Sequence, residues 1–195
     1  MVTPTPTLFV LAGPNGAGKS TLYDLVLKGR LALPFINADN IQRAELKTEE
    51  PGAAYKAANI AAARRDELLR SRASFVMETV FSHPSKLEFV VRAQAAGYRT
   101  SVHHIGLRTA DLAVDRVALR SQRGGHAVPE HKIRERYARN GILIRQAVVR
   151  ADRGVVWDNS ELGSPPQQVL RFREGLETFR TNDVPAWVAE VYDTG

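Results

Sequence analysis

The sequence contains no cysteine among its 195 residues. This absence excludes a disulfide scaffold and a thiolate metal site, and it is compatible with a reducing compartment. No apolar stretch approaches the roughly 20 residues that cross a bilayer. Residues 1–7 lack the basic start and the long apolar run of a signal peptide. We therefore expect a cytoplasmic protein with no membrane partner.

Histidine is also scarce, with five in the chain. His103 and His104 are adjacent in a predicted strand, so they should point to opposite faces and cannot chelate one ion together. His126 and His131 are not a convincing pair of metal ligands either. We therefore predict no histidine metal site.

Residues 13–20 fit the phosphate-loop pattern of Gly, four residues, Gly, Lys and then Ser or Thr. An apolar run at 8–11 precedes them as a predicted buried strand, and a predicted helix follows at 21–28. The glycines let backbone N–H groups turn toward a phosphate, and the helix N-terminus adds partial positive charge. The alternative is a glycine-rich turn that binds nothing. The predicted nucleotide-binding residues are Gly13, Pro14, Asn15, Gly16, Ala17, Gly18, Lys19, Ser20 and Thr21.

Two side chains of this loop have predicted roles. Lys19 is expected to reach the terminal phosphates of ATP or GTP. The Ser20 hydroxyl is the expected protein ligand of Mg²⁺. The sequence therefore predicts a nucleotide and Mg²⁺ as cofactors.

Two further predicted strands, at 33–39 and 74–79, end in polar residues. In open α/β sheets, ligands bind beyond the carboxyl ends of the strands. Asp39 beside a γ-phosphate could accept a proton from an attacking hydroxyl, or it could cap a helix that starts near Asn40, and both can hold. Glu78 could bind a substrate hydroxyl or Mg²⁺, or it could be an exposed strand-end carboxylate.

Basic residues outnumber acidic ones by 27 to 21, and arginines concentrate between positions 108 and 150. This clustering indicates a phosphate-facing segment or, equally, solvated helix faces. Predicted helices at 109–123 and from Pro129 onward flank a Gly124-Gly125 turn and look like a lid, with an ordinary helical hairpin as the alternative. No basic platform with interleaved aromatics is visible, so nucleic acid is not the expected partner. Arg116, Arg120 and Arg123 are spaced to share one helix face.

The order of the predicted elements indicates one α/β domain over 1–195, with a central parallel sheet flanked by helices. Alanines at helical spacing follow Pro51 and suggest close packing against the sheet, so we assign that helix no chemistry. Beyond about position 161, a hairpin at 169–180 that pivots at Gly175 and a helix at 185–192 form a small C-terminal extension. The remaining expected elements are strands at 100–107 and 153–160 and a helix at 85–96.

Several motifs together resemble those of zeta toxin-like P-loop kinases, in particular the short stand-alone members of that family. The resemblance runs from about Leu8 to Ser160. The residues that carry it are the phosphate loop, Asn37-Ala38-Asp39, Glu78-Thr79, Ala96-Gly97-Tyr98, the arginine helix, Gly124-Gly125-His126-Ala127-Val128-Pro129 and Asp158-Asn159-Ser160.

The resemblance implies a P-loop kinase fold with an arginine-rich lid at about 108–140. It implies that Lys19 binds phosphate, that Asp39 is the general base, and that Asn37, Glu78 and Thr79 lie on the sugar or Mg²⁺ side of the site. It also implies that lid arginines, Arg120 with Arg134 or Arg136, stabilise the transferring phosphoryl group, with Arg116 and Arg123 as further lid residues. Classical members phosphorylate a sugar hydroxyl of UDP-N-acetylglucosamine with ATP and Mg²⁺.

Three hypotheses of function follow. The first is a kinase that passes the γ-phosphoryl group to a hydroxyl of a nucleotide-sugar-like acceptor. The second is a kinase of another metabolite, such as a nucleoside or a simple sugar. The third is a nucleotide-dependent switch with an antitoxin-like protein or nucleic acid as partner. Carboxylates at two strand ends favour a kinase over a switch.

Overall fold

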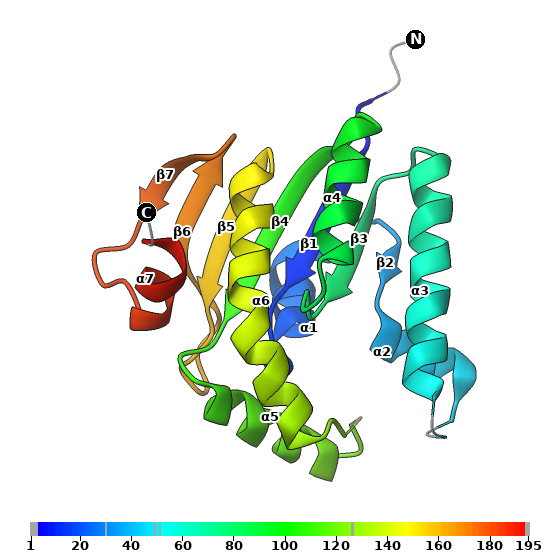
Figure 1. The fold of residues 1–195 in the computed structure, drawn as a ribbon, viewed down its shortest axis with the longest axis vertical. Helices are drawn as coiled ribbons and strands as arrows, with labels where there is room; N and C mark the ends of the chain where they lie inside the picture. Colours follow the sequence, from blue (N-terminus) through cyan, green and yellow to red (C-terminus); the bar gives the residue numbers. More distant parts are fainter. Residues whose placement is uncertain (1–3, 30, 49, 51, 126, 194–195) are drawn as a thin grey trace.

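The computed structural model describes residues 4–29, 31–48, 50, 52–125 and 127–193. Residues 1–3, Pro51 at the expected start of the long helix, and His126 of the expected turn lie outside these ranges. One seven-stranded sheet, in the order β2-β3-β1-β4-β5-β6-β7, organises the described chain (Figure 1). The strands are β1 (Thr7–Ala12), β2 (Phe35–Ile36), β3 (Phe75–Thr79), β4 (Arg99–Gly106), β5 (Arg153–Asp158), β6 (Gln167–Arg173) and β7 (Leu176–Arg180).

The predicted parallel sheet is confirmed for β1 to β5, which all pair in parallel. The last two strands differ, because β6 runs antiparallel to β5 and β7 runs antiparallel to β6. Parallel neighbours need a long crossover, whereas the short connections in this part of the chain allow only antiparallel pairing. The expected hairpin turns at Gly175, which has a φ of 82°. The C-terminal segment therefore continues the main sheet.

Helices cover both faces of the sheet. Buried side chains of α3, α4, α6 and α7 pack in one cluster, and those of α1, its continuation η1 and α5 pack in another on the opposite face (Figure 1). The α-helices are α1 (Lys19–Leu22), α2 (Ala38–Ile41), α3 (Ala53–Arg70), α4 (Ser85–Ala95), α5 (Ala110–Gln122), α6 (Glu130–Arg150) and α7 (Ala186–Tyr192), and the π-helical turns are η1 (Tyr23–Leu27) and η2 (Gln42–Leu46).

The central strands are buried on both sides, as covered parallel sheets require. Val10 and Met77 point into the α3/α4/α6/α7 cluster, and Leu11 and Val76 point into the α1/α5 cluster. All four are fully buried. Burial of each such side chain stabilises the fold by roughly 1.5–3 kcal/mol, so the core holds the strand ends in place.

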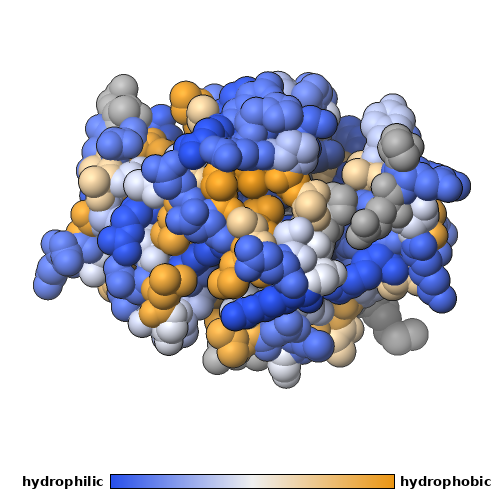
Figure 2. Space-filling view, turned by 90° about the horizontal axis from the view of Figure 1, so that it is seen from below, coloured by the Kyte–Doolittle hydropathy of each residue, from blue (hydrophilic) through white to orange (hydrophobic). Residues whose placement is uncertain are grey.

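The carboxyl ends of the parallel strands meet at one edge of the sheet, next to α2 and α5 (Figure 1). The pairing of Leu11 with Glu78 and of Ala12 with Thr79 brings the phosphate loop and the end of β3 side by side. Seen from this edge, the surface is mainly hydrophilic around a smaller apolar area (Figure 2). Within the described ranges, none of the helices has the length and apolar character needed to traverse a bilayer.

Candidate active site

The phosphate loop is held against the ends of β4 and β5, and its glycines are required by that close approach. Gly18 has a φ of 83° and immediately precedes α1. A Cβ at Gly18 would collide with the side-chain amide of Asn159, and one at Gly13 would collide with the carbonyl oxygen of Ile105. The Asn159 amide also donates a hydrogen bond of 2.9 Å to the carbonyl of Ala17. The conformation of the loop is therefore set by residues that are distant in the chain, of which Asn159 lies 142 positions from Ala17.

Lys19 is the buried cation of the loop. Its Nζ donates to the carbonyl oxygens of Gly13 at 3.1 Å and Pro14 at 2.9 Å. It also lies 4.0 Å from a carboxylate oxygen of Glu78. Burial lowers the pKa of Lys19, while the charges of Glu78 and Asp39 act in the opposite direction. These two carboxylates therefore favour the protonated amine that binding of a phosphate requires.

Glu78 and Ser20 form the second polar contact of the loop. The Ser20 hydroxyl donates to a carboxylate oxygen of Glu78 at 2.8 Å. The Glu78 side chain is only 9% exposed, so the reading as an exposed strand-end carboxylate is wrong. A hydroxyl and a carboxylate that meet beside a phosphate loop are oxygen donors of the kind that Mg²⁺ prefers. The residues present therefore fit a Mg²⁺ ion.

Asp39 lies in the first turn of α2, but Asn37 is the residue that caps this helix. The Asn37 side chain accepts hydrogen bonds from the backbone N–H groups of Asp39 at 2.7 Å and Asn40 at 3.2 Å. The cap interpretation of Asp39 is therefore wrong, because the helix starts two residues earlier than expected. Among the described residues, none donates a hydrogen bond to the Asp39 carboxylate, which leaves its oxygens available to a substrate.

One cavity of about 330 Å³ gathers the predicted catalytic side chains from separate segments. We call it the acceptor cavity. Its walls come from the phosphate loop, α2, the end of β3 with the following loop, α3, and the lid. Thr79 also lines it, and its hydroxyl accepts a 3.1 Å hydrogen bond from the N–H of Phe81. The predicted residues that line the acceptor cavity are Asn15, Gly16, Lys19, Asn37, Asp39, Glu78, Thr79, Arg120 and Arg136.

The segment predicted as a lid forms the helices α5 and α6, and the hydroxyl of Thr109 caps the N-terminus of α5. Arg136 on α6 donates to the side-chain oxygen of Asn15 in the phosphate loop at 3.4 Å. Arg136 and Arg120 both act electrostatically on Lys19, so their guanidinium groups lie near its amine. The Tyr137 hydroxyl donates to the Leu107 carbonyl at 2.7 Å and fixes α6 to the end of β4.

The other three lid arginines lie elsewhere. Arg116 donates to the carbonyl of Ser160 at 3.4 Å, in the segment after β5. Arg123 lines a larger cavity outside the acceptor cavity. Arg134 pairs with Asp111 at 2.6 Å and Glu130 at 2.8 Å, and among the described residues it lines neither cavity. Of the arginines in the predicted lid, Arg120 and Arg136 line the acceptor cavity, whereas Arg134 does not.

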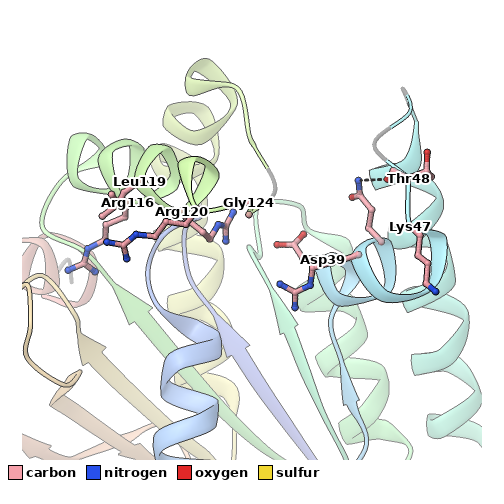
Figure 3. A pocket seen from close by; sticks show the side chains of 11 residues that line it. Asp39, Lys47, Thr48, Arg116, Leu119, Arg120 and Gly124 are labelled. Carbon is pink, nitrogen blue, oxygen red and sulfur yellow. Dashed lines mark hydrogen bonds between the residues drawn. The ribbon is translucent and has the colours of Figure 1, made fainter.

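The larger cavity, of about 690 Å³, adjoins the first, since Asp39 and Arg120 line both. Arg116 and Arg120 extend from α5 on one side, and Asp39 and Lys47 lie across the gap (Figure 3). The lining includes five basic side chains, from Arg43, Lys47, Arg116, Arg120 and Arg123. Such a concentration of positive charge attracts anions such as nucleotide phosphates.

Sequence reasoning missed several cavity residues. The exposed Ala54 and Ala58 and the buried Ala61 line the acceptor cavity together with Arg65, so α3, to which we assigned no chemistry, forms part of the cavity wall. The spacing of these four residues is that of one helix face, but the local sequence does not show which other segments this face lies against. Lys86 on α4 was likewise not predicted.

Comparisons with known proteins give the family and the fold of the chain. A family model described as Zeta toxin matches residues 2–161. A chain of the AvrRxo1-ORF1:-ORF2 complex with ATP matches with a TM-score of 0.67 and 16% identity, over 89% of this chain and 60% of that one. A chain of the PezAT toxin–antitoxin system of Streptococcus pneumoniae matches with a TM-score of 0.57 and 13% identity, over 82% and 70% of the two chains.

These structural likenesses show a shared fold. The chain spans about 60% of the length of the AvrRxo1 chains that it matches. No curated protein matches the sequence.

Proposed function

Because the chain belongs to the Zeta toxin family, we propose that it is an ATP-dependent kinase that phosphorylates a hydroxyl of a small-molecule acceptor. The observation that carries the proposal is the acceptor cavity, in which Lys19, Asp39 and Glu78 meet two lid arginines. Phosphoryl transfer requires a cation near the phosphates, a base near the acceptor and compensation of the transferring charge. The cavity contains side chains suited to each of these roles, which supports the proposal.

In the proposed reaction, the acceptor oxygen forms a bond to the γ-phosphorus as the bond between that phosphorus and ADP breaks. The proton of the acceptor hydroxyl passes to the carboxylate of Asp39. Lys19, Arg120 and Arg136 stabilise negative charge on the transferring group. Phosphate-loop N–H groups hold the remaining phosphates, and Asn159 keeps the loop in its binding conformation.

Ser20 and Glu78 are the residues that would hold Mg²⁺. When bound, the ion would neutralise charge on the nucleotide phosphates. In the protein, the Glu78 carboxylate already contacts two residues: it accepts a hydrogen bond from Ser20 and pairs with Lys19. We propose ATP as the nucleotide, which the AvrRxo1 complex with ATP supports by its common fold.

For the acceptor we propose a nucleotide-sugar-like compound of the UDP-N-acetylglucosamine type, with Asn37, Glu78 and Thr79 near the reacting sugar. The family supports this choice. An antitoxin-like protein is the proposed macromolecular partner, supported by the fold shared with a toxin–antitoxin chain.

Replacement of Asp39 by alanine tests the proposed base. ADP release with a metabolite extract as acceptor source should fall roughly 10²- to 10⁴-fold, because no carboxylate would then accept the proton. An ATP titration should show nearly unchanged nucleotide affinity. Asp24→Ala, an exposed aspartate paired with Lys28, is the matched control and should keep the wild-type rate. A near wild-type rate for Asp39→Ala would contradict the assignment of Asp39 as the general base.

A further inference from the structure

Two basic side chains meet at the wall of the acceptor cavity that α3 and α4 form. Arg65 is only 7% exposed, although it carries a charge. Lys86 on α4 is also partly buried, and both line the cavity. The charge of Arg65 acts with burial to lower the pKa of Lys86, so the two cations lie within electrostatic reach of each other.

Neither Arg65 nor Lys86 forms an ion pair with a carboxylate among the described residues. Asp66, which follows Arg65 in the chain, acts on it electrostatically but forms its ion pair with Arg92 at 2.7 Å. The Arg65 guanidinium lies over the ring of Phe89, 5.7 Å from its centroid. A ring contact of this kind engages the face of the guanidinium and leaves its N–H donors available.

The buried guanidinium of Arg65 and the partly buried ammonium of Lys86 cost free energy of desolvation, and for Arg65 the charge of Asp66 offsets this cost only in part. The alanine face of α3 keeps the space in front of them open. Ala54, Ala58 and Ala61 line the cavity on the same side of the helix, between its N-terminal end and Arg65. An acceptor could therefore extend along this face from Asp39 toward the two cations.

Building on the proposed kinase function, we propose that Arg65 and Lys86 form an anion-binding subsite for the acceptor. The acceptor would then carry, besides its reacting hydroxyl, a phosphate or a carboxylate group. Arginine suits both groups because its planar fork can donate two parallel hydrogen bonds, and lysine adds a point charge. The subsite would orient the hydroxyl toward Asp39.

Titration of inorganic phosphate into the protein saturated with Mg²⁺–ADP tests the subsite directly. Arg65→Gln and Lys86→Gln should each weaken phosphate binding by roughly tenfold or more, because each removes a charge-assisted contact. Arg64→Gln is the matched control, because Arg64 is next to Arg65 in the chain but its guanidinium is exposed and pairs with Glu45 at 2.6 Å. Unchanged ADP affinity in all variants reports that they fold. Wild-type phosphate affinity in both Arg65→Gln and Lys86→Gln would overturn the subsite.

A second experiment asks which metabolites are phosphorylated. A metabolite extract is separated on an anion exchanger, and each fraction is incubated with the wild-type protein and Mg²⁺–ATP. A phosphorylated product from the retained fraction supports the subsite, whereas a product from the unretained fraction alone overturns it and leaves the kinase function intact. Treatment of the retained fraction with phosphatase and phosphodiesterase removes a phosphate acceptor but spares a carboxylate. Absence of product from every fraction counts against the kinase function, while the phosphate titration still decides the subsite.

Discussion

Around β2, β3 and β1, basic side chains crowd into a cavity, whereas around β7 and α7 charged groups form ion pairs within the protein. We call these regions the site side and the closed side. On the site side, Lys19, Arg65 and Lys86 are buried to different degrees, and burial lowers the pKa of each. On the closed side, Arg180 pairs with Glu177 and Asp193, both at 2.8 Å. Only the first arrangement leaves positive charge to be compensated by a ligand.

The difference separates charges that act on a ligand from charges that serve the fold. A buried cation without a full set of partners destabilises the protein unless something anionic binds to it. Exposed ion pairs contribute little to stability and offer little to a ligand. Substitutions on the two sides should therefore have opposite signatures, with activity lost on the site side and only stability changed on the closed side.

The largest effect is expected for Lys19→Met. ADP release with a metabolite extract should fall roughly 10²- to 10³-fold or more, because the substitution removes a buried cation beside the transferring phosphate. Lys28→Met is the control, since that side chain is 65% exposed and pairs with Asp24. Equal activity of Lys19→Met and Lys28→Met would contradict the distinction between the two sides.

The next largest effect concerns stability and pH. His103 and His104 are buried on opposite faces of β4, and burial lowers the pKa of each to about 3. His104 bonds to the hydroxyl of Tyr192 on the closed side at 2.8 Å. A histidine in the unfolded chain has a pKa of about 6.5, so below that pH the unfolded chain binds protons that His103 and His104 of the folded chain do not bind. The free energy of unfolding therefore falls as the pH drops from about 6.5 toward 3.

At pH 5 this proton uptake should cost about 2 kcal/mol for each histidine relative to pH 7 or above. Urea unfolding at pH 7 and pH 5 measures the loss. His104→Gln should make the loss smaller, because one titrating group is gone. An equal loss in His104→Gln and the wild type would show that His104 is not excluded from protonation in the fold.

A smaller effect is expected within the lid, where two arginines of α6 have different partners. Arg136 contacts Asn15 in the phosphate loop, whereas Arg134 pairs with Asp111 and Glu130. Arg136→Gln should lower ADP release about tenfold through loss of charge near the transferring group. Arg134→Gln should change the rate much less. Equal losses in the two variants would mean that the lid acts through its overall charge.

Local patterns predicted much of the site. The phosphate loop, the polar ends of β2 and β3 and the helices α5 and α6 are each encoded within short stretches of sequence, so their types and approximate bounds could be predicted. Contacts between distant segments could not. Asn159 reaches Ala17 across 142 positions, and Arg65 and Lys86 line the same cavity only because α3 and α4 pack on the same face of the sheet. The hairpin of β6 and β7 was predicted, but its antiparallel pairing with β5 was not, because no local pattern shows which strand a hairpin joins.

The smallest effect is expected for Arg180→Gln on the closed side. The substitution removes ion pairs to Glu177 and Asp193, all three of which are partly solvated. Solvent screens such pairs, so the melting temperature should fall by no more than a few degrees and ADP release should stay at the wild-type rate. Thermal unfolding and the extract assay measure both quantities. Lost activity without lost stability would erase the distinction between the two sides, because a charge far from the cavity would then act on the reaction.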